Sequence, residues 1–140
     1  MLRPAARRAA AALALVLAGA CGRTPAVDRT IVVGGDKVTP ARLVDASAGL
    51  CEAKVAATTD PEAARATFYD RSHSALHTVA RGLEPVDRAL AAQLLEAKGK
   101  VEAELEAIPP NPSPADLAAL DDVYRAGLGR LAITAPPCVE

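Results

Sequence analysis

Hydrophobic residues recur at spacings of three and four along most of the chain beyond residue 39, and this pattern predicts amphipathic helices. Three of the helix starts carry a capping residue followed by proline: Thr39-Pro40, Asp60-Pro61 and Ser113-Pro114. Because short connections place successive helices side by side, the pattern favours an all-α, antiparallel four-helix bundle as the domain spanning 40–140. The four helices are expected over residues 40–57, 60–84, 85–107 and 114–132.

The second predicted helix has an apolar face and a polar face. Six of its apolar residues fall within a sector of about 120° around the helix axis, the usual width of a core-facing stripe. Asp70, His73 and His77 fall outside that sector and are expected to face solvent. The stripe consists of Ala64, Phe68, Ala75, Leu76, Val79 and Leu83.

The third predicted helix also separates apolar from charged positions. Its stripe is expected to begin at Val86 and to end at Ile108. The charged residues between them most simply form a solvated outer face. These charged residues are Glu96, Lys98, Lys100, Glu102 and Glu106.

The segment before the first predicted helix contains one β-branched run, Ile31-Val32-Val33, among prolines, glycines and charges. A single strand has no partner to pair with, so a β domain is not expected. We therefore interpret residues 21–39 as a tether that holds the domain off the membrane, with a short extended piece laid against the domain and with Gly34-Gly35 as a turn.

The first twenty residues have the organisation of a secretory signal peptide: basic residues (Arg3, Arg7, Arg8), an apolar run over 9–18, and then small residues. The run is shorter than the roughly 20 apolar residues that a transmembrane helix needs. Residues 1–20 are therefore expected to be a cleaved leader rather than a membrane span.

The sequence Leu17-Ala18-Gly19-Ala20-Cys21 at the end of this leader resembles the lipobox of bacterial lipoproteins. The resemblance implies that Cys21 is lipidated and becomes the first residue of the mature protein. The membrane would then be the partner of the acyl chains, with the domain on the extracytoplasmic side of the cell membrane. The alternative is an ordinary cleaved signal peptide that contains a cysteine.

With Cys21 assigned to the anchor, Cys51 and Cys138 remain as an even pair in an exported chain, which predicts one disulfide. The disulfide would close a loop of 87 positions, and the chain-entropy model gives such a loop at most about 4 to 5 kcal/mol of stabilisation. Metal ligation by the two thiols is the competing interpretation, although no CxxC spacing supports it.

Charge narrows the class of partner. Without the three leader arginines, 13 of the 16 Lys and Arg residues remain against 17 Asp and Glu, a formal charge of −4. Nucleic-acid binding needs a clustered basic face and is not expected. Electrostatic adhesion to anionic lipid is not expected either.

The motif Asp70-x-x-His73-x-x-x-His77 contains both histidines of the chain. Two imidazoles one helical turn apart can bind one divalent ion, here copper or zinc, and Asp70 could act as a third ligand or orient a ring. A solvated helix face with two exposed histidines is the competing interpretation. Because Ser74 rather than Glu follows His73, the HExxH motif of zinc proteases is absent.

No arrangement of nucleophile and base predicts an enzyme. Ser72 and Ser74 flank His73, but neighbours along a helix point about 100° apart and do not face each other. The other hypothesis is a non-catalytic accessory or adaptor lipoprotein, whose charged helix faces bind a protein partner in the cell envelope.

Overall fold

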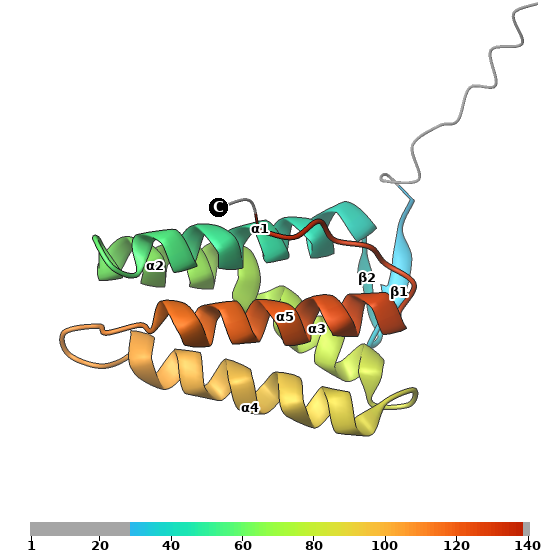
Figure 1. Ribbon diagram of the computed structural model, residues 1–140. Helices are drawn as coiled ribbons and strands as arrows, with labels where there is room; N and C mark the ends of the chain where they lie inside the picture. The colour runs from blue at the N-terminus through green and yellow to red at the C-terminus, as the bar shows by residue number, and fades with distance from the viewer. Residues whose placement is uncertain (1–28, 139–140) are drawn as a thin grey trace, which may run out of the picture.

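The computed structural model describes residues 29–138, which form four helices and a small two-stranded sheet (Figure 1). The predicted leader and the predicted lipidation site, Cys21, lie outside the described residues. A π-helical turn, η2, joins α2 and α3 into one continuous helix. The elements are β1 (Ile31–Val33), β2 (Asp36–Val38), α1 (Pro40–Ala56), α2 (Pro61–Thr67), η2 (Phe68–Ser72), α3 (His73–Leu83), α4 (Arg88–Leu105) and α5 (Pro114–Arg130).

The predicted helix starts are confirmed where a capping residue precedes proline. The side chain of Thr39 accepts a hydrogen bond from the backbone N–H of Arg42, and Ser113 accepts one from Asp116. The third helix starts at Arg88 rather than at residue 85, because Asp87 caps it and Pro85 lies in the preceding turn.

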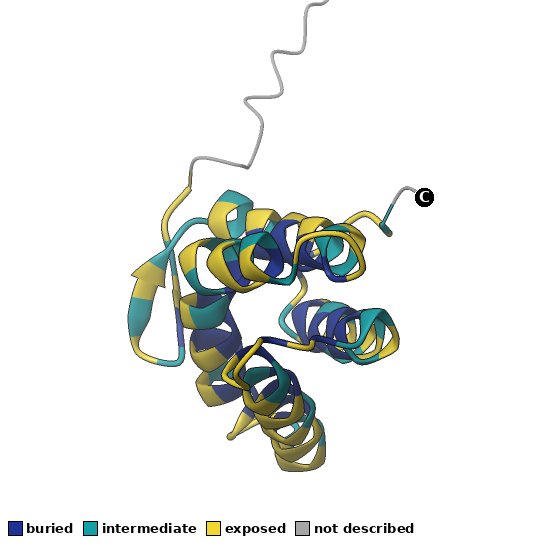
Figure 2. Cartoon of the chain, turned by 90° about the vertical axis from the view of Figure 1, so that its left-hand side faces the viewer, coloured by how far each residue is buried: buried dark blue, intermediate teal, exposed yellow. Residues whose placement is uncertain are grey.

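Each helix packs mainly against two neighbours, and α3 also contacts α5 across the core. Helix α5 lies between α1 and α4, while the continuous helix α2–η2–α3 lies between α1 and α4 on the other side. Figure 2 shows the buried residues facing inward between the helices. All six residues of the stripe predicted for the second helix are buried, so its apolar face is confirmed. Across the core, the hydroxyl of Tyr124 donates a 2.8 Å hydrogen bond to the backbone carbonyl of Leu43.

The expected outer face of α4 is partly wrong. The helix runs only from Arg88 to Leu105, so Val86 and Ile108 fall in the connections, where Ile108 is 98% exposed. Lys98, expected in solvent, is 5% exposed. Its ammonium group donates a 2.6 Å hydrogen bond to Glu102, so the cation is buried without losing its partner.

The expectation that Ile31–Val33 has no partner strand is also wrong. Strand β1 pairs antiparallel with β2 through a two-residue turn in which Gly34 and Gly35 have φ of 56° and 87°. Such a turn requires positive φ at both positions, and two glycines supply it without steric cost. Sequence reasoning read Gly34-Gly35 only as a turn and missed the hairpin.

This hairpin is part of the folded domain rather than of a tether. Asp36 accepts a 2.7 Å hydrogen bond from the hydroxyl of Thr78 on α3 and forms an ion pair with Arg81. Val33 packs so closely on α3 that a Cβ at Gly82 would lie 2.6 Å from its Cγ1 atom. Residues 31–38 therefore lie against the domain, as the extended piece predicted within the tether would, but as two paired strands rather than one.

The predicted disulfide is confirmed: Cys51 on α1 is bonded to Cys138 across a sequence separation of 87, with Cα atoms 5.5 Å apart. The C-terminal tail runs back along α1 to reach it (Figure 1). Across residues 29–138, none of the helices has both the length and the apolar character that crossing a membrane would require.

Candidate functional site

The histidine-bearing helix is shaped by the π turn that precedes it. The hydroxyl of Ser72 donates a 2.8 Å hydrogen bond to the carbonyl of Ala46, and Gly49 lets the two backbones approach, since a Cβ there would lie 2.6 Å from Ser72 Oγ. A π turn contains an extra residue, so positions before it are rotated relative to positions after it. Asp70 therefore does not hold the α-helical relation to His73 that its sequence spacing predicts.

His73 and His77 lie beside each other at the start of α3. Their ring centroids are 4.9 Å apart and the ring planes are nearly perpendicular. His73 is half-buried and also contacts the ring of Tyr69, at 5.2 Å, whereas His77 is exposed. The sequence-predicted pair is thus brought together, with one imidazole fixed by packing and the other open to solvent.

The carboxylate that meets His73 is Glu102 of α4 rather than Asp70. Nε2 of His73 lies 2.9 Å from Oε1 of Glu102, and the same oxygen accepts a 2.6 Å hydrogen bond from Lys98. Asp70 is exposed. Among residues 29–138, the ligand atoms of Asp70, His73 and His77 do not all lie within 4.8 Å of one another.

Sequence reasoning placed Glu102 and Lys98 on a solvated face and missed their contact with α3. Their i, i+4 spacing was the available signal of a mutual ion pair. The rotation of α4 toward α3 that buries Lys98 depends on packing between the two helices, which the charge pattern of a single helix does not specify.

The surroundings of His77 keep it neutral. Its pKa is lowered from the usual 6.5, chiefly because the neighbouring helices remove part of the water around the ring, and further because of the positive charge of Lys98. A neutral imidazole offers a lone pair to a metal, while a protonated one does not.

A surface hollow of about 580 Å³ opens beside the two histidines, between the hairpin and α3. Lys37 and Arg42 line it together with Arg81, whose charge is paired with Asp36. A small solute therefore has access to the imidazoles from the hairpin side.

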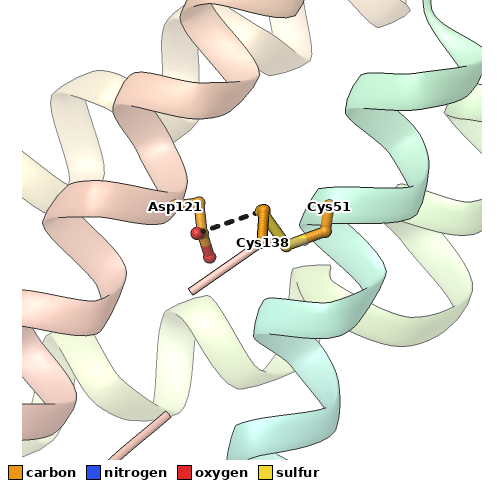
Figure 3. A group of neighbouring side chains, drawn as sticks. All are labelled: Cys51, Asp121 and Cys138. Atoms are coloured by element: carbon orange, nitrogen blue, oxygen red, sulfur yellow. Dashed lines mark hydrogen bonds between the residues drawn. A yellow bond between two sulfur atoms is a disulfide. The ribbon is translucent and has the colours of Figure 1, made fainter. Parts of the chain in front are cut away.

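A second cluster of reactive groups lies at the disulfide. Cys51, Asp121 and Cys138 are the one set of three ligand-type side chains that the described chain holds with atoms within 4.8 Å of one another (Figure 3). Because the two sulfurs are bonded to each other, they are not free thiolate ligands, and the thiol metal site that competed with the disulfide does not form in this state.

Asp121 is buried, with 3% of its surface exposed. Its Oδ1 accepts a 2.6 Å hydrogen bond from the hydroxyl of Ser47, and its Oδ2 lies 3.5 Å from Sγ of Cys138. Burial raises the pKa of this carboxyl group, against the opposing effect of Ser47 and of Arg125. Sequence reasoning missed Asp121, although its position between Leu117 and Tyr124 on the inner stripe of α5 was a signal.

Comparisons with models of protein families, with curated proteins and with solved structures found no match for this chain.

Proposed function

We propose that the protein is an exported lipoprotein, attached to the extracytoplasmic face of the cell membrane through lipidated Cys21, whose domain binds one copper or zinc ion through His73 and His77. The proposal is a binding function without catalysis. Its anchoring part rests on the basic segment, apolar run and lipobox-like sequence before Cys21. Its metal-binding part rests on the contacts of the histidine pair.

The proposal includes an antiparallel four-helix bundle as the scaffold. The cyclic order of packing, in which α1 contacts both α5 and the continuous α2–η2–α3 helix while α4 contacts the other side of each, supports this class. A bundle built in this way presents side chains of neighbouring helices to each other, as His73 and Glu102 are presented here.

The observation that carries the metal proposal is the 2.9 Å contact between His73 Nε2 and Glu102. A histidine that binds metal through one ring nitrogen commonly donates the other N–H to a carboxylate, which fixes the tautomer and the ring orientation. The contact with Glu102 would leave Nδ1 of His73 as the ligand atom. Glu102 replaces Asp70 in the orienting role that the sequence motif suggested.

The spacing of the rings also supports a shared ion. A metal–nitrogen bond of about 2.1 Å puts a ring centroid about 3.2 Å from the ion, so two imidazoles at a tetrahedral angle have centroids about 5 Å apart. The observed separation is 4.9 Å. The buried ammonium group of Lys98 opposes a cation at this position, and its pairing with Glu102 offsets part of that repulsion.

The test is calorimetric titration of the purified protein with zinc(II) and copper(II), together with elemental analysis. The wild-type chain is expected to bind one ion, and the double variant His73→Ala, His77→Ala is expected to bind none. Glu102→Gln keeps a carbonyl acceptor for His73 but loses the negative charge, and we expect it to weaken binding about 10- to 100-fold.

Asp70→Asn is the matched control, because it removes the carboxylate that the motif contains but that the structure leaves exposed. It is expected to bind metal as the wild type does. Stoichiometric binding by the double histidine variant would refute the site, and a loss of binding in Asp70→Asn would restore Asp70 as a ligand.

An envelope adaptor is the second candidate function. A groove of about 870 Å³, lined mainly by apolar side chains, runs between α1 and the C-terminal tail, with Val44, Ile133 and Pro136 among its residues. Apolar grooves of this kind suit a protein partner. If the purified protein neither contains nor takes up metal, and crosslinking in membranes traps one specific neighbour, the adaptor proposal replaces the metal proposal.

A further inference from the structure

The disulfide is accessible from outside the protein. Cys51 and Cys138 are each partly exposed, and both border the groove along the C-terminal tail. Both also border a second hollow of about 590 Å³, next to Val55 and Thr59. A disulfide buried on all sides resists exchange because no thiolate can reach a sulfur, whereas this one can be approached from two directions.

The inner side of the same disulfide meets an acid. Figure 3 shows the carboxyl group of Asp121 directed at Cys138 from α5, and its Oδ2 lies 3.5 Å from that sulfur. A disulfide sulfur carries no proton, so this contact is a hydrogen bond only when Asp121 itself carries the proton. An ionised Asp121 would instead place a negative charge against sulfur lone pairs in a buried position.

We propose that Cys51–Cys138 is a thiol–disulfide exchange centre that reacts with a protein dithiol, in which Cys51 is the sulfur attacked and Asp121 is the proton donor to Cys138. The proposal depends on neither the histidine site nor the lipid anchor. It assigns a chemical role to a buried polar pair, Asp121 and Ser47, that the metal proposal does not use.

The first step breaks the disulfide. A thiolate of the incoming dithiol attacks Sγ of Cys51 and forms a mixed disulfide, while the electron pair of the broken S–S bond passes to Sγ of Cys138. The proton on Oδ2 of Asp121 moves to that sulfur and gives a neutral thiol. Without this transfer a thiolate would form beside the carboxyl group in a poorly solvated site.

The second step completes the exchange. The remaining thiol of the partner, as a thiolate, attacks its own sulfur in the mixed disulfide and releases Cys51, which takes a proton from water. The partner dithiol loses two electrons and two protons to become a disulfide, and the two cysteines gain them. Asp121 then recovers its proton from solvent. In the reverse reaction, which forms the Cys51–Cys138 disulfide again, the carboxylate of Asp121 accepts the proton of Cys138.

Several groups set the protonation of Asp121. Its pKa is raised chiefly by burial and further by the neighbouring charge of Asp122, while the Ser47 hydroxyl and the charges of Arg125 and Lys54 lower it. These groups come from α1 and α5, the two helices packed around the carboxyl. A raised pKa keeps the acid protonated over a wider range of pH than an exposed aspartate.

The test measures the rate at which a water-soluble phosphine reduces the disulfide in the full chain, from pH 4 to 9. Asp121→Asn preserves the shape but cannot transfer a proton. Asp70→Asn is the matched control, because Asp70 is an exposed aspartate on η2 and is not one of the groups that set the protonation of Asp121. Taking rates relative to the control at each pH cancels the titration of the phosphine. At low pH the wild type is expected to react about 10- to 100-fold faster than Asp121→Asn.

The ratio of the wild-type reduction rate to the Asp121→Asn rate is expected to fall as pH rises and Asp121 ionises. The wild type then carries a negative charge that the variant lacks. A purely structural role predicts the opposite result at low pH, since loosening the site would make Asp121→Asn react faster. A ratio that is constant with pH would overturn the proposal, as would reduction that occurs only at the rate of global unfolding.

A second measurement tests which sulfur is attacked. Brief treatment with glutathione at limiting concentration, followed by acid quenching and peptide mapping, is expected to place the mixed disulfide on Cys51. Its location on Cys138 would overturn the assignment of the leaving sulfur. Circular dichroism of each oxidised variant verifies that the compared proteins are folded.

Discussion

Glu102 and Asp121 are carboxyl groups on neighbouring helices of one domain, in opposite environments. Glu102 is partly exposed and meets the cation of Lys98 and the ring of His73. Asp121 is buried and meets the neutral hydroxyl of Ser47 and a sulfur atom. The comparison shows how the same chemical group is set differently by its surroundings: the carboxylate of Glu102 lies between a cation and an imidazole, whereas burial raises the pKa of the Asp121 carboxyl group.

The two regions also differ in what they contribute to stability. The disulfide region closes a loop of 87 positions, whereas the histidine pair lies on a surface with partly exposed partners. The double variant Cys51→Ser, Cys138→Ser is therefore expected to lower the free energy of unfolding by up to about 4 to 5 kcal/mol. Urea denaturation monitored by circular dichroism measures the change.

The double variant His73→Ala, His77→Ala provides the contrast for this stability measurement. Metal-free, it is expected to lower the free energy of unfolding by only about 1 kcal/mol, because His73 is half-buried and His77 is exposed. Equal losses in the two double variants would contradict the division of the molecule into a structural and a binding region.

The buried acid predicts a pH dependence of stability. The folded-state pKa of Asp121 is raised above its usual 3.8, so the folded state binds more protons than the unfolded state between the two values. Stability is then lost as pH rises from the unfolded pKa through the folded pKa. Asp121→Asn is expected to remove this loss, measured by urea denaturation across that pH window against the control Asp70→Asn, whose aspartate is exposed. A slope unchanged by the substitution would contradict an elevated pKa.

Much of the scaffold follows from sequence because local signals agree with the tertiary structure. The capping residues Thr39 and Ser113 begin their helices as predicted, and the 3.6-residue periodicity identifies the core face of the continuous helix. Cysteine parity identified the disulfide for the same reason, since only two cysteines remained to be paired.

The missed features depend on contacts between elements distant in sequence. The π turn is stabilised by Ser72 bonding to Ala46 and by Arg71 pairing with Asp45, on the neighbouring helix. Because regular helical spacing ignores the π turn, it assigned Asp70 to the histidine site. It omitted Glu102, which reaches His73 from another helix. The hairpin is different, because Gly34-Gly35 between apolar runs is itself a local signal of a two-residue turn.

The smallest expected effect comes from removing the positive charge of Lys98 near the histidine pair. Lys98→Met keeps a long aliphatic side chain at this buried position but removes the positive charge that acts on His77. The pKa of His77 in the metal-free protein is expected to move up toward 6.5, and burial keeps it from reaching that value. NMR titration of the imidazole protons measures the change.

Lys100→Met is the control for this titration, because Lys100 pairs with Asp116 on another side of α4. It should leave the pKa of His77 where it is in the wild type. Since the same ammonium group repels a cation, Lys98→Met is also expected to bind zinc more tightly than the wild type at a pH where both imidazoles are neutral. A variant that moves the pKa but leaves zinc affinity unchanged would indicate that the ion does not lie beside Lys98, and the ligands would then have to be sought away from the His73–Glu102 contact.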